Sequence, residues 1–154
     1  MVMSMSLRIY LDVCCLNRPF DDLRQDRIRL EAEAVKAILR RIDGGQWEGV
    51  DSPAIKYETL RMPDMDRMLE VGLIAKRMQI KVSPTPDVHR RALILENTGF
   101  SALDAVHLAF AEKAKANVFL TSDDALLKRA RRCQESLDVI VDNPLRWFER
   151  EVRK

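Results

Sequence analysis

The sequence predicts an α/β fold, a three-layer α/β/α sandwich around a mainly parallel central sheet. Two observations lead to this fold class. Short segments that read as buried strands alternate with longer segments of helical apolar spacing. The first strand candidate, Leu7–Val13, is rich in β-branched and aromatic residues and lacks the alternation of a half-exposed strand. The chain has 154 residues and no linker or shift in composition, so we expect one domain over residues 1–154.

Apolar spacing and capping residues set the expected elements of the first half of the chain. After the first strand, Asn17–Asp22 interrupts the pattern as a loop. Helical spacing then runs from about Asp26 to Ile42 and stops at the pair Gly44 and Gly45. Trp47–Asp51 is a second strand candidate, and Ser52–Pro53 supply the capping hydroxyl and first-turn proline of the next helix.

The second half continues the alternation to the C-terminus. In chain order we first expect an amphipathic helix marked by Met65, Met68, Leu69, Ala75 and Met78, and then a short strand at Ile80–Val82. Two helices follow, one to about Asn97 with Gly99 just past its end, and an apolar one from Ser101 to about Ala116. The last expected elements are a strand at Val118–Thr121, a helix at Asp124–Arg132, a strand at Asp138–Val141 and a terminal helix from Asn143–Pro144. Strands that alternate with helices in this way are typical of βα units that build a parallel sheet.

Composition limits the classes of protein to which the chain can belong. Apolar residues make up 47% and charged residues 32%, as in ordinary globular proteins. No apolar run approaches the length of a membrane span, and Met1–Ser6 lacks the pattern of a signal peptide, so we expect a cytoplasmic protein without a membrane partner. The three cysteines, two of them the neighbours Cys14 and Cys15, form neither a disulfide framework nor a zinc-ligand pattern, and we interpret them as small buried hydrophobes.

Four acidic residues are the main candidates for a functional site. Asp12 and Asp123 lie at the carboxyl ends of two expected strands, the edge at which α/β sheets collect their ligands. Glu58 and Asp104 lie on helices that pack against or lead away from the sheet. Four carboxylates in one pocket would repel one another unless a cation neutralised them, and ligands that are all oxygen select hard ions such as Mg²⁺ or Mn²⁺. Hydrolysis of a phosphodiester is the obvious use of such a site.

Each acid except Asp12 also has an ordinary structural explanation. These alternatives are Asp104 in the first turn of a helix capped by Ser101, Asp123 as the cap of the following helix, and Glu58 as a surface residue paired with Arg61 or Lys56. Asp12 differs because an acid within an apolar strand is costly to bury without a partner or a metal. His107 lies one turn after Asp104 and fits either a satisfied packing histidine or a residue that contacts phosphate or supports the acids.

Clustered cations in the C-terminal half are a candidate RNA surface. The residues are Lys128, Arg129, Arg131 and Arg132. Such a cluster tracks a phosphate backbone in some proteins and is a solvated helix face in most, and the net charge of +2 does not separate the two.

The motifs around these acids resemble the PIN-domain family, in particular the VapC-like toxin ribonuclease subgroup. Tyr10–Asp22 is similar to the opening motif of that subgroup, and Tyr57–Leu60 contains a glutamate at the second acidic position. Phe100–Ala109 and Phe119–Asp124 resemble the third and fourth acidic motifs in the right order, and Asn143–Pro144 also fits the subgroup. Together these motifs span almost the whole chain.

The resemblance implies a PIN-like fold and a metal-dependent ribonuclease. It implies that Asp12, Asp104 and Asp123 face the metal, that Glu58 positions metal or water, and that Thr121 and Asn17 support them. Mg²⁺ or Mn²⁺ would be the cofactor, RNA the substrate, and a cognate antitoxin a partner. The apolar residues Met65, Met68, Leu69 and Met78 fit either the core or a subunit interface. Related toxins pair, so we also expect a homodimer.

One departure from the family pattern leaves an alternative open. Many PIN domains carry Asn or Ser two residues after the first acid, and this chain carries Cys14, whose thiol is a weak hydrogen-bonding group. A catalytically decayed scaffold that binds nucleic acid or assembles with other proteins is therefore the alternative, although all four acids are retained. A phosphatase with Asp12 as nucleophile is a weaker alternative, because it needs a second acid where Cys14 stands.

Overall fold

The computed structural model describes residues 6–154 and confirms the α/β class. The strands are β1 (Arg8–Leu11), β2 (Glu48–Asp51), β3 (Ile80–Lys81), β4 (Val118–Leu120) and β5 (Ile140–Asp142). The helices are α1 (Val13–Asn17), α2 (Asp26–Asp43), α3 (Pro53–Leu60), α4 (Met65–Lys76), α5 (Pro86–Thr98), α6 (Ala102–Lys113), α7 (Asp124–Arg132) and α8 (Pro144–Val152), with short 3₁₀ turns at Arg18–Phe20 and Gln134–Ser136. The expectation for Met1–Ser6 falls mainly on residues 1–5, which lie outside the described part of the chain.

All pairings in the five-stranded sheet are parallel, in the order β3-β2-β1-β4-β5. The chain moves from β1 to β2 in one direction and reaches β4 on the other side of β1, so the order reverses between β1 and β4. A reversal of this kind opens a crevice at the carboxyl ends of the two strands. The fold therefore directs the residues that follow β1 and β4 to one place.

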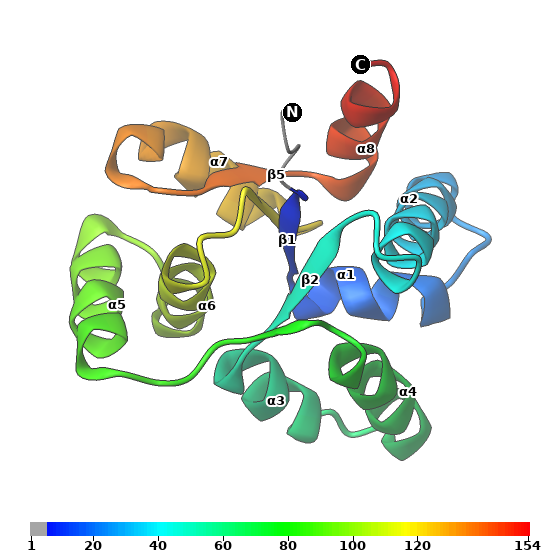
Figure 1. Ribbon diagram of the computed structural model, residues 1–154. Helices are drawn as coiled ribbons and strands as arrows, with labels where there is room; N and C mark the ends of the chain where they lie inside the picture. Colours follow the sequence, from blue (N-terminus) through cyan, green and yellow to red (C-terminus); the bar gives the residue numbers. More distant parts are fainter. Residues whose placement is uncertain (1–5) are drawn as a thin grey trace.

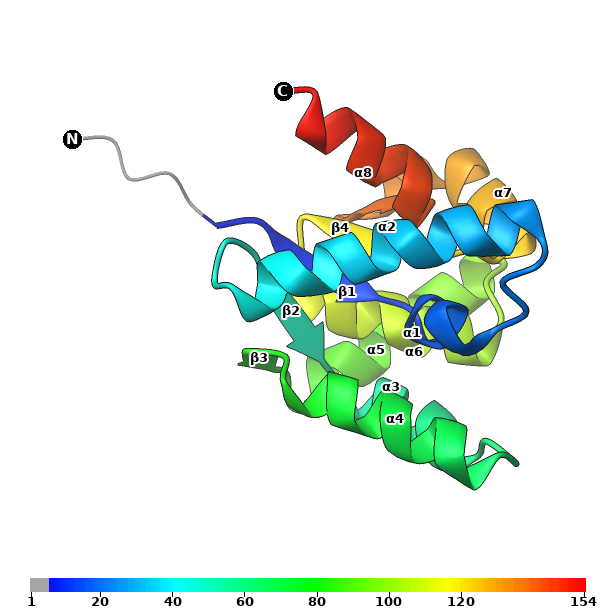
Figure 2. The ribbon, with the colours of Figure 1, turned by 90° about the vertical axis from the view of Figure 1, so that its right-hand side faces the viewer.

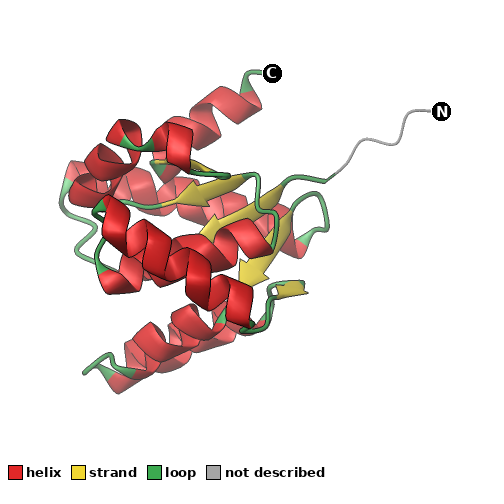
Figure 3. Cartoon of the chain, turned by 90° about the vertical axis from the view of Figure 1, so that its left-hand side faces the viewer, coloured by secondary structure: helices red, strands yellow, loops and turns green. Residues whose placement is uncertain are grey.

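Helices cover both faces of the sheet (Figure 1). In that view α5, α6 and α7 lie on one side of the strands, and α1, α2 and α8 lie on the other, which gives three layers. Helices α3 and α4 pack beyond the β2–β3 end of the sheet, as the side view also shows (Figure 2). Helices dominate the molecule and the strands are short (Figure 3). Within residues 6–154, no helix combines the length and apolarity that crossing a membrane requires.

The centre of the core is built from β1 and β4, two of the three strands with neighbours on both sides. Ile9, Tyr10 and Leu11 are at most 1% exposed, and the ring of Tyr10 stacks on Phe119 with centroids 5.0 Å apart. A strand buried on both faces cannot alternate apolar and polar residues, which is why β1 lacks alternation. This packing holds fixed the end of β1, which carries the first acid.

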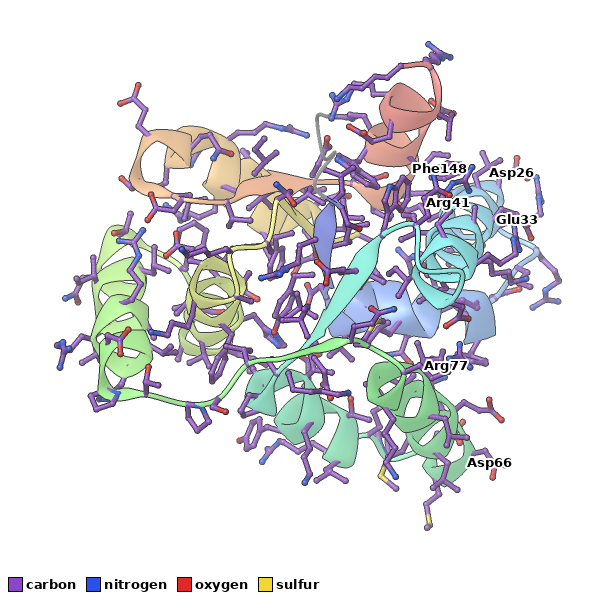
Figure 4. All side chains as sticks on the ribbon, viewed as in Figure 1. Asp26, Glu33, Arg41, Asp66, Arg77 and Phe148 are labelled. Carbon is purple, nitrogen blue, oxygen red and sulfur yellow. The ribbon has the colours of Figure 1, made fainter. Side chains whose placement is uncertain are left out.

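A second aromatic cluster attaches α8 to the α2 side of the sheet. The rings of Trp47 and Trp147 meet edge to face, with centroids 5.2 Å apart. The Arg41 guanidinium of α2 lies over the ring of Phe148, 4.8 Å from its centroid, and Figure 4 shows these two side chains together. Such cation–π contacts stabilise by about 0.5–1 kcal/mol at exposed sites. The C-terminal helix is therefore docked against α2.

The structure corrects several expected boundaries. The first strand ends at Leu11 instead of Val13, because the Asp12 carboxylate caps a new helix by accepting from the Val13 amide. The segment Asn17–Asp22, expected as a loop, contains the end of α1 and a 3₁₀ turn. Helix α6 ends at Lys113 instead of Ala116, and Lys115 adopts a positive φ of 58°. Strand β5 begins two residues later than expected, at Ile140.

The methionine stripe expected on one helix face is divided by the tertiary structure. Met65 and Leu69 are exposed on α4, and Met68 is half-buried. Met78 lies beyond the end of α4 and is buried against Gly49 of β2, where any side chain at Gly49 would overlap its sulfur. The expectation that Met78 lies on the same helix as Met65 and Met68 was wrong, because α4 ends at Lys76 and the chain turns toward β3 before Met78.

A buried glutamate that the sequence patterns did not single out ties three elements together. Glu31 of α2 is 2% exposed and accepts from Arg18 Nε at 2.9 Å, from Arg27 Nε at 3.3 Å and from Asn143 Nδ2 at 2.6 Å. Arg18 belongs to the turn after α1, and Asn143 caps α8. A buried carboxylate is tolerated only when paired and hydrogen-bonded in this way.

Candidate active site

The candidate site lies where the strand order reverses, at the carboxyl ends of β1 and β4. Asp12 follows β1 directly, and its amide donates to the carbonyl of Leu120 at the end of β4. Asp123 follows β4 and caps α7. The position agrees with the crevice in which open α/β sheets bind ligands.

Asp12 is buried and its carboxylate has assigned partners on both oxygens. Oδ1 accepts from the Val13 amide at 2.9 Å, and Oδ2 accepts from the Thr121 hydroxyl at 2.8 Å. Burial raises the pKa of this carboxyl above its ordinary value, and the negative charge of Glu58 raises it further, while His107 and Thr121 oppose the shift. Burial therefore makes the ionised form of Asp12 energetically costly, and a bound cation would offset that cost.

Thr121 connects the first acid with the fourth. Its hydroxyl donates to Asp12 and accepts from the Asp123 amide at 3.1 Å, and the residue is fully buried. Asp123 itself caps α7, with Oδ1 accepting from the amides of Ala125 at 2.9 Å and Leu126 at 3.3 Å. The capping alternative for Asp123 is thus what the structure shows, and among residues 6–154 its other oxygen has no hydrogen bond.

Asp104 lies in the first turn of α6, three residues after the cap. The Ser101 hydroxyl accepts from the Asp104 amide at 3.2 Å, which is the ordinary capping arrangement. Burial raises the pKa of Asp104, and the charges of Asp12 and Asp123 raise it further. Burial and the neighbouring acids thus act on the pKa of Asp104 in the direction opposite to the helix dipole, which favours the ionised form.

Glu58 of α3 meets His107 of α6 instead of a surface cation. Glu58 Oε1 lies 2.8 Å from His107 Nε2. Arg61, one of the expected partners of Glu58, instead lies over the Tyr57 ring at 5.1 Å from its centroid. The surface-pair alternative for Glu58 is therefore wrong.

Three ligand atoms gather tightly in the site. One atom each of Asp12, Glu58 and His107 lies within 4.8 Å of the other two. Ligands of one divalent ion at bonds of roughly 2.0–2.6 Å stay within about 5 Å of one another, so the two carboxylates fit a shared cation. Asp104 and Asp123 do not join this group, although their charges reach it. The structure therefore brings the four acids to one region without closing them into one cage.

The sequence indicates at most a supporting role for His107, whereas the structure places it between Tyr10 and Glu58 in the site. It is 1% exposed, and Nδ1 lies 2.6 Å from the Tyr10 hydroxyl. That hydroxyl lies 2.7 Å from Ser52 Oγ. Burial raises the pKa of Tyr10 well above its usual range, so the phenol keeps its proton. The helical spacing of His107 from Asp104 was a signal for this role, whereas nothing in the sequence linked Tyr10 and Ser52 to the site.

The cysteine that departs from the family pattern contacts the site. Cys14 is half-buried, with Sγ 3.5 Å from Asp12 Oδ2 and 3.3 Å from Thr121 Oγ1. Its sulfur also accepts from the Ser122 amide at 3.4 Å. Cys15 is buried as expected, but Cys14 and Cys133 are only partly covered. The thiol thus takes part in the same hydrogen-bonding network as the hydroxyl of Thr121.

The other residues predicted from the sequence, Asn17 and the cations of α7, lie outside the group of Asp12, Glu58 and His107. Asn17 Nδ2 donates to the carbonyl of Val13 at 3.1 Å and so holds the last turn of α1, while its buried Oδ1 has no partner among residues 6–154. The cations of α7 are all exposed, and two of them, Arg129 and Arg131, lie beside different parts of the fold. Arg129 packs toward Gly99, where an added Cβ would lie 3.0 Å from its Nη1, whereas Arg131 lines a groove shared with Arg27 and Arg146.

The fold and this site together define a class of protein, an α/β fold with an acidic cluster at the switch point of a parallel sheet. No protein-family model matches the chain, and no curated protein does so. Among solved structures the chain is similar to VapBC2 from Rickettsia felis bound to a promoter DNA fragment. The TM-score is 0.55 and the sequence identity is 11%, and the match covers 89% of this chain and 98% of that chain. The likeness concerns the fold, which is the PIN-like three-layer sandwich expected from the sequence.

Proposed function

We propose that this protein is a divalent-metal-dependent endoribonuclease of the PIN-domain, VapC-like type. The observation that carries the proposal is the meeting of Asp12, Glu58 and the charges of Asp104 and Asp123 at the switch point of the sheet. The motif resemblance and the fold shared with VapBC2 support the same class.

We assign each of the four acids a role in metal binding or catalysis from its surroundings. Asp12 is fixed by Thr121 and the Val13 amide, so it offers a rigid anchor for Mg²⁺ or Mn²⁺. Asp104 in the first turn of α6 and Asp123 at the N-cap of α7 add negative charge. Glu58 engages only Oε1 among residues 6–154, which leaves Oε2 to orient a water for attack on the phosphate. A bound ion would stabilise the charge that develops on the phosphate and the leaving oxygen.

The test compares RNA cleavage by wild type and by Asp12→Asn with Mn²⁺, with Mg²⁺ and with chelator. We expect cleavage of structured or single-stranded RNA only by wild type with metal. Asp104→Asn and Asp123→Asn should also abolish it, while Glu58→Gln should lower turnover more than metal affinity. Equal cleavage by wild type and Asp12→Asn would refute the site. Metal-independent RNA binding without cleavage would instead favour the decayed-scaffold alternative.

We further propose that the protein is the toxin of a toxin–antitoxin pair. The support is the motif resemblance together with the fold of VapBC2, which is itself a two-component complex by its name. The product of a small adjacent gene, added in equimolar amount, should suppress RNA cleavage. Full activity in its presence would argue against that partner.

A further inference from the structure

Four buried or half-buried groups form one continuous hydrogen-bonded row that ends on Glu58. The row runs from Ser52 Oγ to Tyr10 Oη at 2.7 Å, on to His107 Nδ1 at 2.6 Å, and from His107 Nε2 to Glu58 Oε1 at 2.8 Å. Its members come from β1, α6, α3 and the residue that caps α3. The row therefore joins β1, α3 and α6, which are distant in the sequence, and it ends on Glu58, the acid proposed above to orient a water.

The row has one donor direction that satisfies every group. Tyr10 is a neutral phenol with one proton, and an ionised Glu58 can only accept. A neutral imidazole carries one ring proton, so when Nε2–H donates to Glu58 the unprotonated Nδ1 must accept from the Tyr10 hydroxyl. The Tyr10 oxygen then accepts from the Ser52 hydroxyl, whose own oxygen accepts from the Ile55 amide at 3.3 Å. Ser52, Tyr10 and His107 thus each donate once, in the direction of Glu58.

We propose that His107 is a positioning residue held in its Nε2–H tautomer by Tyr10 and Ser52, and that it fixes the Glu58 carboxylate for catalysis instead of binding the metal itself. The proposal rests on the ribonuclease function proposed above. An Nε2 that carries a proton and donates to Glu58 has no lone pair for a cation, although it lies within 4.8 Å of Asp12. A histidine that only filled space would not need both ring nitrogens engaged at 2.6–2.8 Å.

Nitrogen-detected NMR of the histidine rings tests the tautomer without any assay of activity. The chain has two histidines, and the exposed His89 serves as the internal reference. We expect His107 to show a protonated Nε2 with slow solvent exchange and an unprotonated Nδ1, both unchanged when Mg²⁺ is added to saturation. An Nδ1–H tautomer, or loss of the Nε2 proton on addition of Mg²⁺, would overturn the proposal.

Kinetics of matched variants test the positioning role. His107→Leu removes the donor, and we expect kcat to fall about 10–100-fold, the usual cost of losing a group that orients a ligand, with little change in KM or in half-saturation by Mg²⁺. His107→Gln restores an N–H near the Nε2 position and should recover most of kcat. Tyr10→Phe removes only the tautomer lock and should give an intermediate loss. His89→Gln is the control and should match wild type.

A double-mutant cycle separates this proposal from general destabilisation. In a Glu58→Gln background, His107→Leu should cost almost nothing more, because His107 acts through the Glu58 carboxylate, which that background lacks. Full multiplication of the two losses would overturn the positioning role. If wild type cleaves no RNA under any metal, the proposed function fails, while the NMR experiment still decides the tautomer.

Discussion

Asp12 has two structural tasks at the residue scale, since it caps α1 and faces the acidic cluster. One oxygen is committed to the Val13 amide and the other to Thr121. Asp12→Asn keeps the capping oxygen and the shape but removes the charge. A substitution at this position therefore separates the electrostatic role of the residue from its local structural role.

Metal binding should stabilise the protein through this charge. A ligand that binds only the native state at a hundredfold excess over its Kd stabilises by about 2.7 kcal/mol. We expect Mn²⁺ or Mg²⁺ to raise the Tm of wild type and Asp12→Asn to show a blunted rise, measured by thermal denaturation. Identical melting curves of wild type with and without saturating metal would contradict the site.

In chelator the same acids should make stability depend on pH. The pKa values of Asp12 and Asp104 are raised in the folded protein, with burial as the main cause for both. Their neutral forms favour folding, so this contribution is fully present below the unfolded value near 3.8 and is lost as the pH rises through the folded values. The measurement is the midpoint of urea unfolding against pH, with Asp12→Asn/Asp104→Asn as control. An equal decline in that variant would assign the effect to other groups.

At the scale of elements, Glu31 shows how α2 holds the turn after α1 and the start of α8. Removal of one partner from a buried ion pair typically costs 3–5 kcal/mol, and Glu31→Ala should cost about 3 kcal/mol because Arg27 is half exposed. Denaturant unfolding measures this loss. Glu33→Ala is the matched control, since Glu33 lies on the outer side of the same helix (Figure 4) and its side chain is 63% exposed. Equal effects of the two changes would contradict the role of Glu31.

The two flanks of α7 should differ in their contribution to RNA binding. Arg129 packs toward Gly99, in the turn that leads to the cap of the helix carrying Asp104, whereas Arg131 faces the groove beside α2 and α8. We expect Arg129→Gln to weaken RNA binding and to lower the slope of log K against log salt by about 0.7 for each lost phosphate contact. Arg131→Gln should change the RNA affinity and this slope little. Binding measured across a salt series decides, and equal slopes for both variants would contradict the distinction.

At the scale of the whole molecule, the surface of α3 and α4 carries several exposed apolar side chains. The exposed large apolar side chains there are Tyr57, Leu60, Met65, Leu69 and Leu73. Three of them, Leu60, Leu69 and Leu73, line a groove of about 510 Å³ between the two helices. Exposed apolar surface of this kind marks interaction sites in soluble proteins.

We expect this surface to form a two-fold homodimer. Two-fold pairing buries the same patch on both subunits and is the commonest closed symmetry. Leu69→Lys/Leu73→Lys should convert the dimer to a monomer in light scattering without loss of helical content. Leu93→Lys on α5, another exposed leucine, is the control. Monomeric wild type at high micromolar concentration would contradict the expectation.

The sequence by itself determined the elements and the fold class, because their causes are local. Capping side chains at Ser52, Ser101 and Asn143 start helices in the structure as their types indicate, and Gly99 ends α5 with a φ of 123°. The continuous apolar character of β1 likewise indicated a strand covered on both faces. Such signals act over a few residues and can be read without the tertiary structure.

Only the tertiary structure decided which partners the acids have. The direction of the chain after α4 buried Met78, and the crossing of α3 with α6 gave Glu58 a buried histidine instead of Arg61 or Lys56. The 2.8 Å contact between Thr121 and Asp12 joins residues 109 positions apart, and no local pattern specifies such a pairing. Long-range contacts depend on how all the layers pack at once. The sequence therefore identified the candidate acids, while the packing of β1, α3 and α6 brought Asp12 and Glu58 together beside His107.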